Sequence, residues 1–256
     1  MNIKVDIIVP VLNDLRVVDC IESIRQFDDL SATRILIMAG SSSKEFVEEV
    51  RRNLRDHDII SNDPDVGLFD ALNKGLRLSD APIIGWLGAD DIYSSSLSCS
   101  EVLDNFGNNY EAVIYSTAYH RNGRVTRVLD SKFSRPSYMS WGFHNPHFST
   151  FLIRELAVSR FFKLSEFAAN QFADIEYFLD ILPNSKMKIV PSIGTYMAEG
   201  GAGSGSIKAV WINSTHRYNL FKNKYGVIRG LCSVNVNLAW KIYEKVRRKI
   251  FLQRVA

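Results

Sequence analysis

Two adjacent aspartates, Asp90 and Asp91, follow an apolar segment at residues 82–87, separated from it only by a glycine and an alanine. Acidic side chains beyond the carboxyl end of a buried strand lie where open α/β sheets bind ligands. Such carboxylates can hold a divalent cation against a diphosphate, because hard cations prefer oxygen ligands. A solvated turn or a helix cap would also use aspartate, but the position after a buried strand favours the binding site.

The elements that must position these aspartates alternate between strand and helix. Apolar runs predict strands, and apolar residues at helical spacing predict helices between them. Ser43 is a suitable N-cap for the second helix. The order implies a parallel sheet with helices on both faces. The predicted strands are residues 4–9, 34–38, 58–61 and 82–87, and the predicted helices are residues 17–27, 44–55 and 68–78.

The second half of the chain has a less regular pattern. The pair Asn122-Gly123 between two apolar runs is a strong hairpin signal. The run GGAGSGS at residues 200–206 predicts a flexible loop, and residues 207–256 are predicted to be helical throughout. The further predictions are helices at residues 96–106 and 172–182 and strands at residues 112–119, 124–129, 150–153 and 186–191.

Composition limits the classes of protein that the chain can represent. With 256 residues, of which 46% are apolar, it can form one large domain with a sizeable core. A net charge of +3 is too weak to argue for nucleic-acid binding. Cys20, Cys99 and Cys232 lie far apart, which favours reduced thiols in a cytoplasmic protein over a disulfide or a metal site. We find no signal peptide and no apolar stretch of about 20 residues that could span a bilayer.

A longer motif precedes the acidic pair in the sequence. Asp65 and the run from Gly67 to Gly75 match the pattern D-x-G-[IL]-[YF]-D-A-[ML]-N-K-G, and a strand ending in Asp-Asp follows. This segment resembles family 2 glycosyltransferases of the GT-A fold, in the branch that builds bacterial polysaccharides. The resemblance extends over roughly residues 3–205. It implies an α/β fold of the GT-A type, with a Rossmann-like, mostly parallel sheet, flanking helices and a C-terminal helical tail.

The resemblance also implies a division of the chain. Residues 1–206 would form the GT-A domain, with a nucleotide-binding half at residues 1–106 and an acceptor-binding half at residues 107–206. Residues 207–256 would form a basic helical extension.

The resemblance assigns a metal and a nucleotide site. Asp91 would bind Mn²⁺ or Mg²⁺, which stabilises the charge that develops on the departing nucleoside diphosphate. Asp90 would contact the ribose side, and Asp63 and Asp65 are available for the base or the ribose. Lys74 could face the phosphates or be an ordinary surface lysine. The family places its nucleotide pocket at the exits of the first two strands, here Pro10, Leu12, Asn13 and Ala39.

Two departures from the family pattern put the identity of the base in doubt. Leu12 replaces an aromatic residue that often stacks on the base. The segment from Ala39 to Lys44 lacks both acids of the usual D-G-x-S-x-D pattern, the first of which commonly binds uracil.

The acceptor side rests on a second set of motifs. Asp174 matches the family's general base, which would deprotonate the acceptor hydroxyl and contribute roughly 10²–10⁴-fold in rate. Glu176 is the alternative base. His147 matches a family histidine that contacts the diphosphate, the metal or the acceptor, and Gly201 lies in the loop that could close over the donor. His144 and His147 could form a metal pair, but Pro146 makes a regular helix between them unfavourable.

The C-terminal segment at residues 240–254 is strongly basic and carries aromatic residues at helical spacing. Such a helix suits an anionic membrane surface, although it could also pack on the domain and show its charged side to water. Membrane contact would suit an enzyme whose acceptor is a glycan on a lipid carrier. No nucleic-acid-reading module is visible.

We therefore expect an inverting, metal-dependent enzyme that transfers a hexose or N-acetylhexosamine from a nucleotide sugar, with a UDP-sugar as the expected donor. The acceptor would be a lipid-linked glycan in the synthesis of a bacterial surface polysaccharide such as lipopolysaccharide or capsule. The alternative is a non-catalytic GT-A-like partner of another transferase. A nucleotidyltransferase is a weaker third interpretation, because the first strand is not followed by a glycine-rich basic loop.

Overall fold

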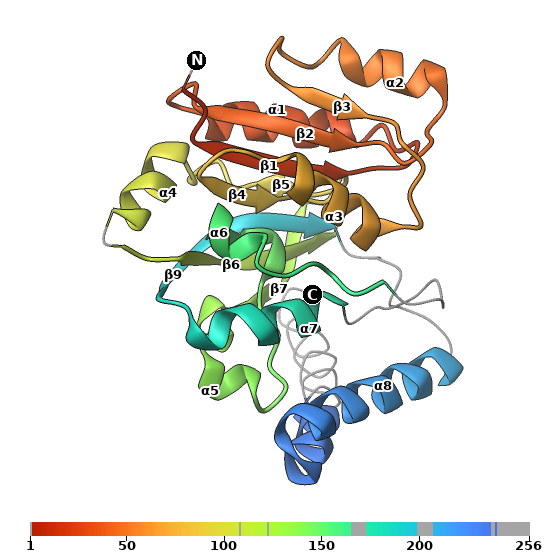
Figure 1. The fold of residues 1–256 in the computed structure, drawn as a ribbon, viewed down its shortest axis with the longest axis vertical. Coiled ribbons are helices and arrows are strands. Elements are labelled where there is room, and N and C mark those ends of the chain that lie inside the picture. The colour runs from red at the N-terminus through yellow and green to blue at the C-terminus, as the bar shows by residue number, and fades with distance from the viewer. Residues whose placement is uncertain are drawn as a thin grey trace, which may run out of the picture.

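The computed structural model describes residues 2–107, 109–121, 123–164, 173–198, 207–236 and 239 of the chain, with side chains from residue 213 onward in the last segment. Its centre is one nine-stranded sheet flanked by helices (Figure 1). The strands are β1 (Val5–Pro10), β2 (Thr33–Met38), β3 (Ile59–Ser61), β4 (Ile83–Trp86), β5 (Ile92–Tyr93), β6 (Ala112–Arg121), β7 (Arg124–Leu129), β8 (Thr150–Ile153) and β9 (Met187–Ala198).

The helices differ widely in length. Three short 3₁₀ turns lie at Ser131–Ser134, His147–Ser149 and Leu182–Asn184. The α-helices are α1 (Val17–Phe27), α2 (Lys44–Arg51), α3 (Leu68–Leu78), α4 (Cys99–Phe106), α5 (Pro136–Met139), α6 (Arg154–Ala157), α7 (Ala173–Ile181) and α8 (Ile207–Tyr225).

The sheet order is β3-β2-β1-β4-β8-β6-β9-β5, and β7 pairs with β6 alone. The strands β1 to β4, β6 and β9 run in one direction, whereas β5, β7 and β8 run in the other. The sheet is therefore mostly parallel, as the sequence predicts. Because the parallel strands end at the same edge, the loops that follow β1, β2, β3 and β4 meet there.

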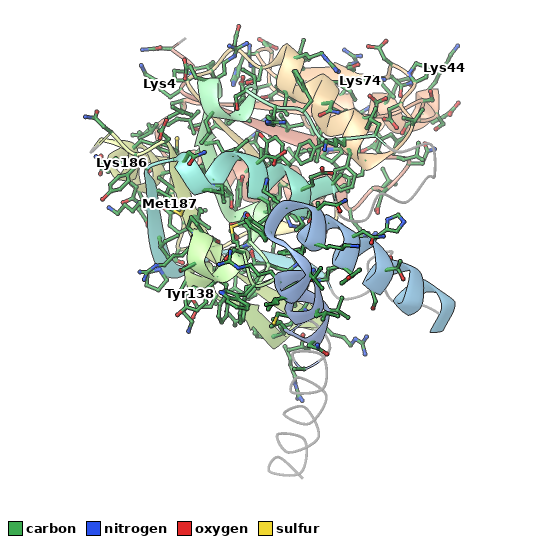
Figure 2. All side chains as sticks on the ribbon, turned by 60° about the horizontal axis from the view of Figure 1, so that its bottom comes forward. Lys4, Lys44, Lys74, Tyr138, Lys186 and Met187 are labelled. Carbon is green, nitrogen blue, oxygen red and sulfur yellow. The ribbon has the colours of Figure 1, made fainter. Side chains whose placement is uncertain are left out.

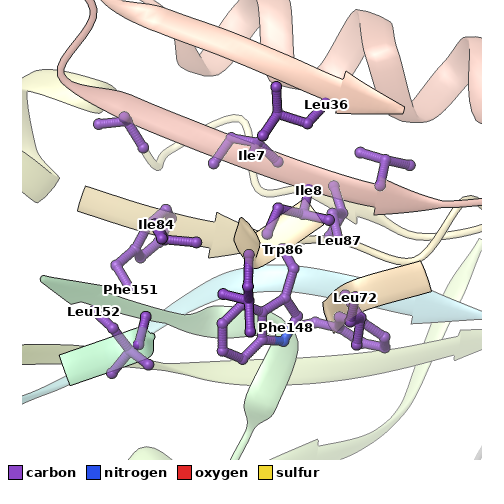
Figure 3. Packing of buried hydrophobic residues seen from close by; sticks show 14 of the residues in the cluster. Ile7, Ile8, Leu36, Leu72, Ile84, Trp86, Leu87, Phe148, Phe151 and Leu152 are labelled. Carbon is purple, nitrogen blue, oxygen red and sulfur yellow. The ribbon is translucent and has the colours of Figure 1, made fainter. Parts of the chain in front are cut away.

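Right-handed crossovers place α1 and α3 on opposite faces of the sheet, as Figure 1 shows. Aromatic side chains fill the core on both faces. On the α1 face, Phe27 packs against Tyr93 and Phe151. On the other face, Trp86 of β4 contacts Phe178 of α7, with ring centroids 5.8 Å apart. Figure 3 shows Trp86 among the aliphatic side chains of β1, β4 and α3.

Most predicted elements are confirmed, with differences at their ends. The helix predicted from residue 44 has Ser43 as its N-cap but ends at Arg51 and not at residue 55. The helix predicted from residue 96 begins at Cys99, because the Ser98 hydroxyl accepts from the Glu101 N–H and caps it there. The strand predicted at residues 186–191 continues to Ala198, and its pairing with β6 shifts register around Pro191.

The prediction of one continuous helix from residue 207 onward is wrong. The helix α8 ends at Tyr225, and Gly226 adopts a φ of +91°, a conformation that few residues other than glycine tolerate. The chain is helical again at residues 227–236. The loop at residues 200–206 and the basic segment at residues 240–254 lie outside the described residues. None of the described helices combines the length and the apolar character that a membrane crossing requires.

Candidate functional site

The loops that follow β1, β2 and β3 are joined by neutral side chains. Asn13 donates its N–H to the Ser42 hydroxyl at 3.0 Å, and its side-chain oxygen accepts from the Ser43 N–H at 2.8 Å. Asn62 accepts from the Ser42 N–H at 2.8 Å and donates to the Ser42 carbonyl at 3.0 Å. Asn13 therefore builds the rim of the expected nucleotide pocket. Sequence reasoning did not identify Ser42 or Asn62, because their partners lie 20 or more residues away.

The other residues predicted at these strand exits differ in exposure. Pro10 and Ala39 are buried, and the Ala39 N–H donates to the Ser61 carbonyl at 2.7 Å. Leu12, in the place of the family's stacking aromatic, is exposed at the rim. Asp63 accepts from the hydroxyl of Ser61 at 2.8 Å. These residues lie at the exits of β1, β2 and β3.

Asp65 lies against the exit of β2. One of its oxygens accepts from the Gly67 N–H at 2.9 Å, and the other lies so close to Gly40 that a Cβ atom there would overlap it. Gly40 also has a φ of +52°, which glycine tolerates best. The carboxylate thus lies beside the strand exit where the sequence lacks both expected acids.

Lys74 holds the loop before α3. Its ammonium group donates to the Pro64 carbonyl and lies 3.5 Å from the Asp70 carboxylate. Asp70 in turn accepts from the Val66 N–H at 3.2 Å. Figure 2 shows Lys74 at the surface. Its contacts are those of a residue that holds a loop, and neither alternative for Lys74, a phosphate ligand or a surface lysine, is tested by them.

Asp91 is a buried carboxylate, with only 2% of its surface exposed. It accepts from the Ala198 N–H at 3.1 Å, and its other oxygen lies against Gly88, where a Cβ atom would overlap it. Burial, together with the negative charge of Asp90, raises the pKa of Asp91 to about 7, although the Ala198 hydrogen bond and Arg16 oppose these effects. The site therefore favours an added positive charge.

Arg16 supplies one cation at the rim of this acidic pair. It lies in the loop between β1 and α1, where its guanidinium bonds Asp14 at 3.0 Å and lies 3.2 Å from an oxygen of Asp90. The hydrogen bond from Arg16 lowers the pKa of Asp14. Because Arg16 is largely exposed, its ion pairs contribute little to stability. Sequence reasoning missed this residue, since only the fold brings it to Asp90.

The donor set at Asp90 and Asp91 fits a divalent ion that arrives with a diphosphate. Within the described residues, no group of three or more His, Cys, Asp or Glu side chains is arranged to hold a metal ion. Mg²⁺ usually binds through one or two carboxylates together with substrate phosphates and not in an all-protein cage. A buried carboxylate beside a second one at the rim matches that pattern.

Asp174 and His147 come together on the acceptor side. Asp174 lies in the first turn of α7, and its carboxylate is 3.5 Å from Nδ1 of His147, which begins the 3₁₀ turn before β8. Burial lowers the pKa of His147, although the Asp174 charge opposes this. The second oxygen of Asp174 is buried and has no hydrogen-bond partner among the described residues. Within the described residues, this carboxylate therefore keeps one unsatisfied acceptor atom.

The strand β9 connects the two acidic sites. Its last residue, Ala198, donates to Asp91 at 3.1 Å. Three residues earlier, the Thr195 hydroxyl donates at 2.9 Å to the carbonyl of Phe148, the neighbour of His147. One strand end thus fixes both the acidic pair and the turn that carries His147.

The remaining candidates on this side differ in their partners. Glu176 forms an ion pair with Lys163. His144 lies 3.2 Å from the Arg217 guanidinium, so the two histidines have different partners and do not face one metal. Gly201 lies outside the described residues.

Asn73 anchors the chain segment ahead of α7, a role that sequence reasoning did not assign. This buried side chain donates to the Phe162 carbonyl at 2.9 Å and accepts from the Phe162 N–H at 2.8 Å. Phe162 also stacks on Tyr177 of α7, with ring centroids 4.2 Å apart. The motif helix α3 therefore helps to place the helix that carries Asp174.

Comparisons with known proteins identify the fold. The chain is similar in structure to TarS residues 1–349 of S. aureus in complex with UDP-GlcNAc (13% identity, TM-score 0.64, covering 85% of this chain and 67% of that one). It is also similar to the mannosyltransferase PcManGT of Pyrobaculum calidifontis in complex with GDP-Man and Mn²⁺ (13% identity, TM-score 0.58, covering 100% and 76%). These likenesses show the fold, which is that of GT-A glycosyltransferases.

A longer TarS structure of S. aureus is similar as well (12% identity, TM-score 0.61), and the chain spans only 40% of its length. No curated protein matches the chain. The family model described as Glycosyl transferase family 2 matches residues 6–178, which is more than half of the sequence. The chain therefore belongs to glycosyl transferase family 2.

Proposed function

We propose that this protein is an inverting, metal-dependent glycosyltransferase that uses a nucleotide-sugar donor. The observation that carries the proposal is the buried Asp91 carboxylate beside Asp90, at the sheet edge where GT-A folds bind ligands. Burial and the neighbouring Asp90 charge both disfavour the ionised form of Asp91, so a bound cation would stabilise this site. Asp91 would hold Mn²⁺ or Mg²⁺, and the ion would stabilise the charge on the departing nucleoside diphosphate.

The nucleotide would lie across the exits of the first strands. Asp65, Asp63 and Asp90 supply acceptors for its base and ribose hydrogens, and Asn13 shapes the rim together with Pro10, Leu12 and Ala39. Lys74 would reach the phosphates only if it left the Pro64 carbonyl. We assign residues 1–106 to this nucleotide-binding half and residues 107–206 to the acceptor-binding half, followed by the extension at residues 207–256.

Asp174 acts as the general base in this proposal. It takes the proton of an acceptor hydroxyl, whose oxygen forms a bond to the anomeric carbon while the bond from that carbon to the diphosphate oxygen breaks. His147, at 3.5 Å, orients the carboxylate. A single displacement of this kind inverts the anomeric centre, and no second carboxylate is required as a nucleophile.

The donor is a UDP- or GDP-sugar in our proposal, with a UDP-sugar as the first candidate. This choice is supported by the UDP-GlcNAc in the TarS complex and the GDP-Man in the mannosyltransferase complex. A hexose or an N-acetylhexosamine would be transferred. The motif at residues 65–75 supports a role in bacterial surface polysaccharide, with a lipid-linked glycan as acceptor at the inner face of the cytoplasmic membrane.

A thermal-shift screen tests the proposal. UDP-, GDP-, dTDP- and CMP-sugars would be added with and without Mn²⁺ to the wild type and to Asp91→Asn. A ligand that binds the native state raises the melting temperature by mass action. We expect one nucleotide class to stabilise the wild type only with metal, and Asp91→Asn to lose that shift. No shift with any donor would contradict the proposal and favour a non-catalytic partner of another transferase.

A further inference from the structure

Arg217 of α8 carries a positive charge into the interior of the protein. Its exposed fraction is 1%. Burial lowers the pKa of this side chain to about 10, although the charge of Asp174 opposes this, so the guanidinium stays ionised at pH 7. Its hydrogen bonds go to groups without a charge. The Nε donates to the Ser233 carbonyl at 2.9 Å, the Nη2 donates to the Gly142 carbonyl, and the Nη1 lies 3.2 Å from Nε2 of His144.

No carboxylate among the described residues lies in ion-pair contact with Arg217. Arg34, which is also largely buried, bonds the carboxylate of Asp6 at 2.9 Å. A buried ionised group without such a partner is costly. Holding a backbone segment does not require a charge, since Asn73 bonds the N–H and the carbonyl of Phe162 with a neutral amide. The charge of Arg217 therefore indicates a role beyond its hydrogen bonds.

Two of these hydrogen bonds hold the chain segment that leads to His147. Arg217 bonds this segment at Gly142 and at His144. Because a guanidinium can only donate, Nε2 of His144 accepts, and the ring proton of this neutral histidine lies on Nδ1. His147 follows three residues later and begins the 3₁₀ turn in which its Nδ1 lies 3.5 Å from the Asp174 carboxylate. Arg217 therefore fixes one end of a segment whose other end contacts the proposed base.

Two further contacts fix α8 against the body of the protein and against α7, the helix that carries Asp174. Phe221, one turn after Arg217, is fully buried in the hydrophobic core. Lys224 donates to the carboxylate of Asp180 in α7. In Figure 1, α8 lies on the side of α7 that faces away from β1 to β3. These contacts hold Arg217 in a fixed position relative to Asp174.

Asp174 has other titratable side chains around it. His147 comes from the turn before β8, and burial lowers its pKa against the Asp174 charge, so it is neutral at pH 7. Glu176 lies two residues further along α7 and is paired with Lys163. Of His147 and Arg217, on both of which the Asp174 charge acts, only Arg217 is therefore ionised at pH 7.

We infer that Arg217 is a positioning residue for the proposed base Asp174: it holds the segment that carries His147 and supplies a positive charge near the carboxylate. In the proposed function, on which this inference rests, the base must be ionised to accept a proton, and a nearby positive charge favours that form. Because Arg217 is buried, it acts through Asp174 and His147 and does not touch a substrate. The segment after residue 206 thus contributes to the acceptor-binding half.

Nitrogen-15 NMR of the histidine rings tests the contact in the full chain without any ligand. The chain contains five histidines, and a His144→Gln spectrum assigns the signals of that ring. We expect the ring proton of His144 on Nδ1 in the wild type. In Arg217→Gln the shorter amide cannot reach all three partners, so we expect a mixture of the two ring tautomers.

Turnover tests the effect on the base. The assay measures the release of nucleoside diphosphate from UDP-GlcNAc and from GDP-Man with Mn²⁺, with water in the place of the acceptor hydroxyl. We expect Arg217→Gln to lower kcat at pH 7 about tenfold or more and to leave KM for the donor unchanged. The fall of kcat at low pH should begin about one pH unit higher, because a carboxylate that loses a nearby positive charge needs a higher pH to ionise.

Two further variants separate the charge from the structural contacts. Arg217→Lys keeps the charge but not all three hydrogen bonds, so it should restore the wild-type pH dependence and only part of kcat. The matched control is Arg154→Gln. Arg154 is a half-buried arginine that donates to the Ser79 carbonyl at 2.9 Å, beside the amino end of β4 and thus at the sheet edge opposite the acidic pair. Its replacement should leave kcat and the pH dependence of kcat unchanged.

Three results would overturn the inference. The first is a His144 ring proton on Nε2 in the wild type, and the second is wild-type kcat and pH dependence in Arg217→Gln. The third is an equal loss of kcat in Arg217→Gln and Arg217→Lys without a change in pH dependence, which would make Arg217 a structural residue only. If Arg217→Gln does not fold, an altered pH dependence in Arg217→Lys would contradict the role of the charge. No release of diphosphate by the wild type would count against the proposed function, and the NMR spectra would then decide separately whether Arg217 holds the segment.

Discussion

The carboxylate of Asp174 lies 3.5 Å from Nδ1 of His147, although the two residues come from different elements, the start of α7 and the turn before β8. Burial keeps the pKa of His147 below its usual value, so the imidazole is neutral at pH 7. A neutral imidazole can donate one hydrogen bond to the carboxylate without removing its charge. This pair is therefore suited to hold a general base in one orientation.

Replacing the proposed base should stop transfer and spare donor binding. In Asp174→Asn the amide cannot accept the acceptor proton, so we expect kcat to fall by roughly 10²–10⁴-fold. The donor-induced thermal shift should remain, because Asp174 is not part of the nucleotide half. Glu176→Gln is the matched control, since Glu176 is already paired with Lys163 and should retain most activity. A normal transfer rate in Asp174→Asn together with a large loss in Glu176→Gln would reassign the base.

The metal-free protein should lose stability as the pH rises through the titration of Asp91. Its pKa is about 7 in the folded state and about 3.9 in the unfolded state, so the folded state binds more protons between these values. The contribution is fully present below about pH 4 and is lost as the pH rises to about 7. The full loss is on the order of 4 kcal/mol.

Urea unfolding of the wild type and Asp91→Asn across this pH range checks the expectation. The free energy of unfolding of the variant, relative to the wild type, should increase with pH up to about pH 7 and then level off. Taking the difference between the two proteins removes the titration of all groups that they share. A difference that does not change with pH would show that Asp91 titrates as an ordinary exposed aspartate.

Gly40→Ala should disturb the nucleotide pocket through Asp65. The added methyl group would overlap the Asp65 carboxylate, so we expect donor binding to weaken about tenfold as well as a loss of about 1 kcal/mol from the strained φ. Gly123→Ala is the control, because it has a φ of +72° with no atom near its Cβ position. The control should share the stability loss and keep normal donor binding by isothermal titration. Equal donor binding by the two variants would show that Asp65 does not take part in binding the donor.

Asn73→Ala should destabilise the protein strongly, because Asn73 is buried. The change leaves the Phe162 N–H and carbonyl unpaired, and each unpaired buried group costs about 1–3 kcal/mol. Urea unfolding measures the loss. Asn53→Ala, which removes an exposed hydrogen bond to the Glu49 carbonyl, should change the free energy of unfolding by less than about 0.5 kcal/mol. Similar losses in the two variants would mean that Asn73 does not anchor the segment ahead of α7.

The first half of the fold is readable from the sequence because its periodicity is strong. Each of β1, β2 and β4 is one short apolar run, and α1 buries its apolar residues at helical spacing as predicted. The continuation of β9 was missed, since Pro191 interrupts the strand pattern and lies where the pairing with β6 shifts register. The four-residue helices α5 and α6 are too short to produce a periodic signal.

The site shows where sequence reasoning ends. The sequence identifies as candidates the aspartates that follow a strand or begin a helix, because carboxylates in such places can bind a metal or accept a proton. These are Asp90, Asp91 and Asp174. Arg16 and Arg217 could not be identified in this way, because an arginine indicates a solvated surface until its partners are known. The same holds for Asn73, whose partner lies 89 residues away.

Equilibrium dialysis of the best-stabilising nucleotide sugar tests the central claim most directly. The wild type and Asp91→Asn would be compared with excess Mn²⁺ and with EDTA. We predict that EDTA weakens donor binding by the wild type at least about tenfold, and that Asp91→Asn binds equally weakly in both conditions, because the metal joins Asp91 to the diphosphate. Equal binding by the wild type with Mn²⁺ and with EDTA, or metal-stimulated binding by Asp91→Asn, would contradict the account.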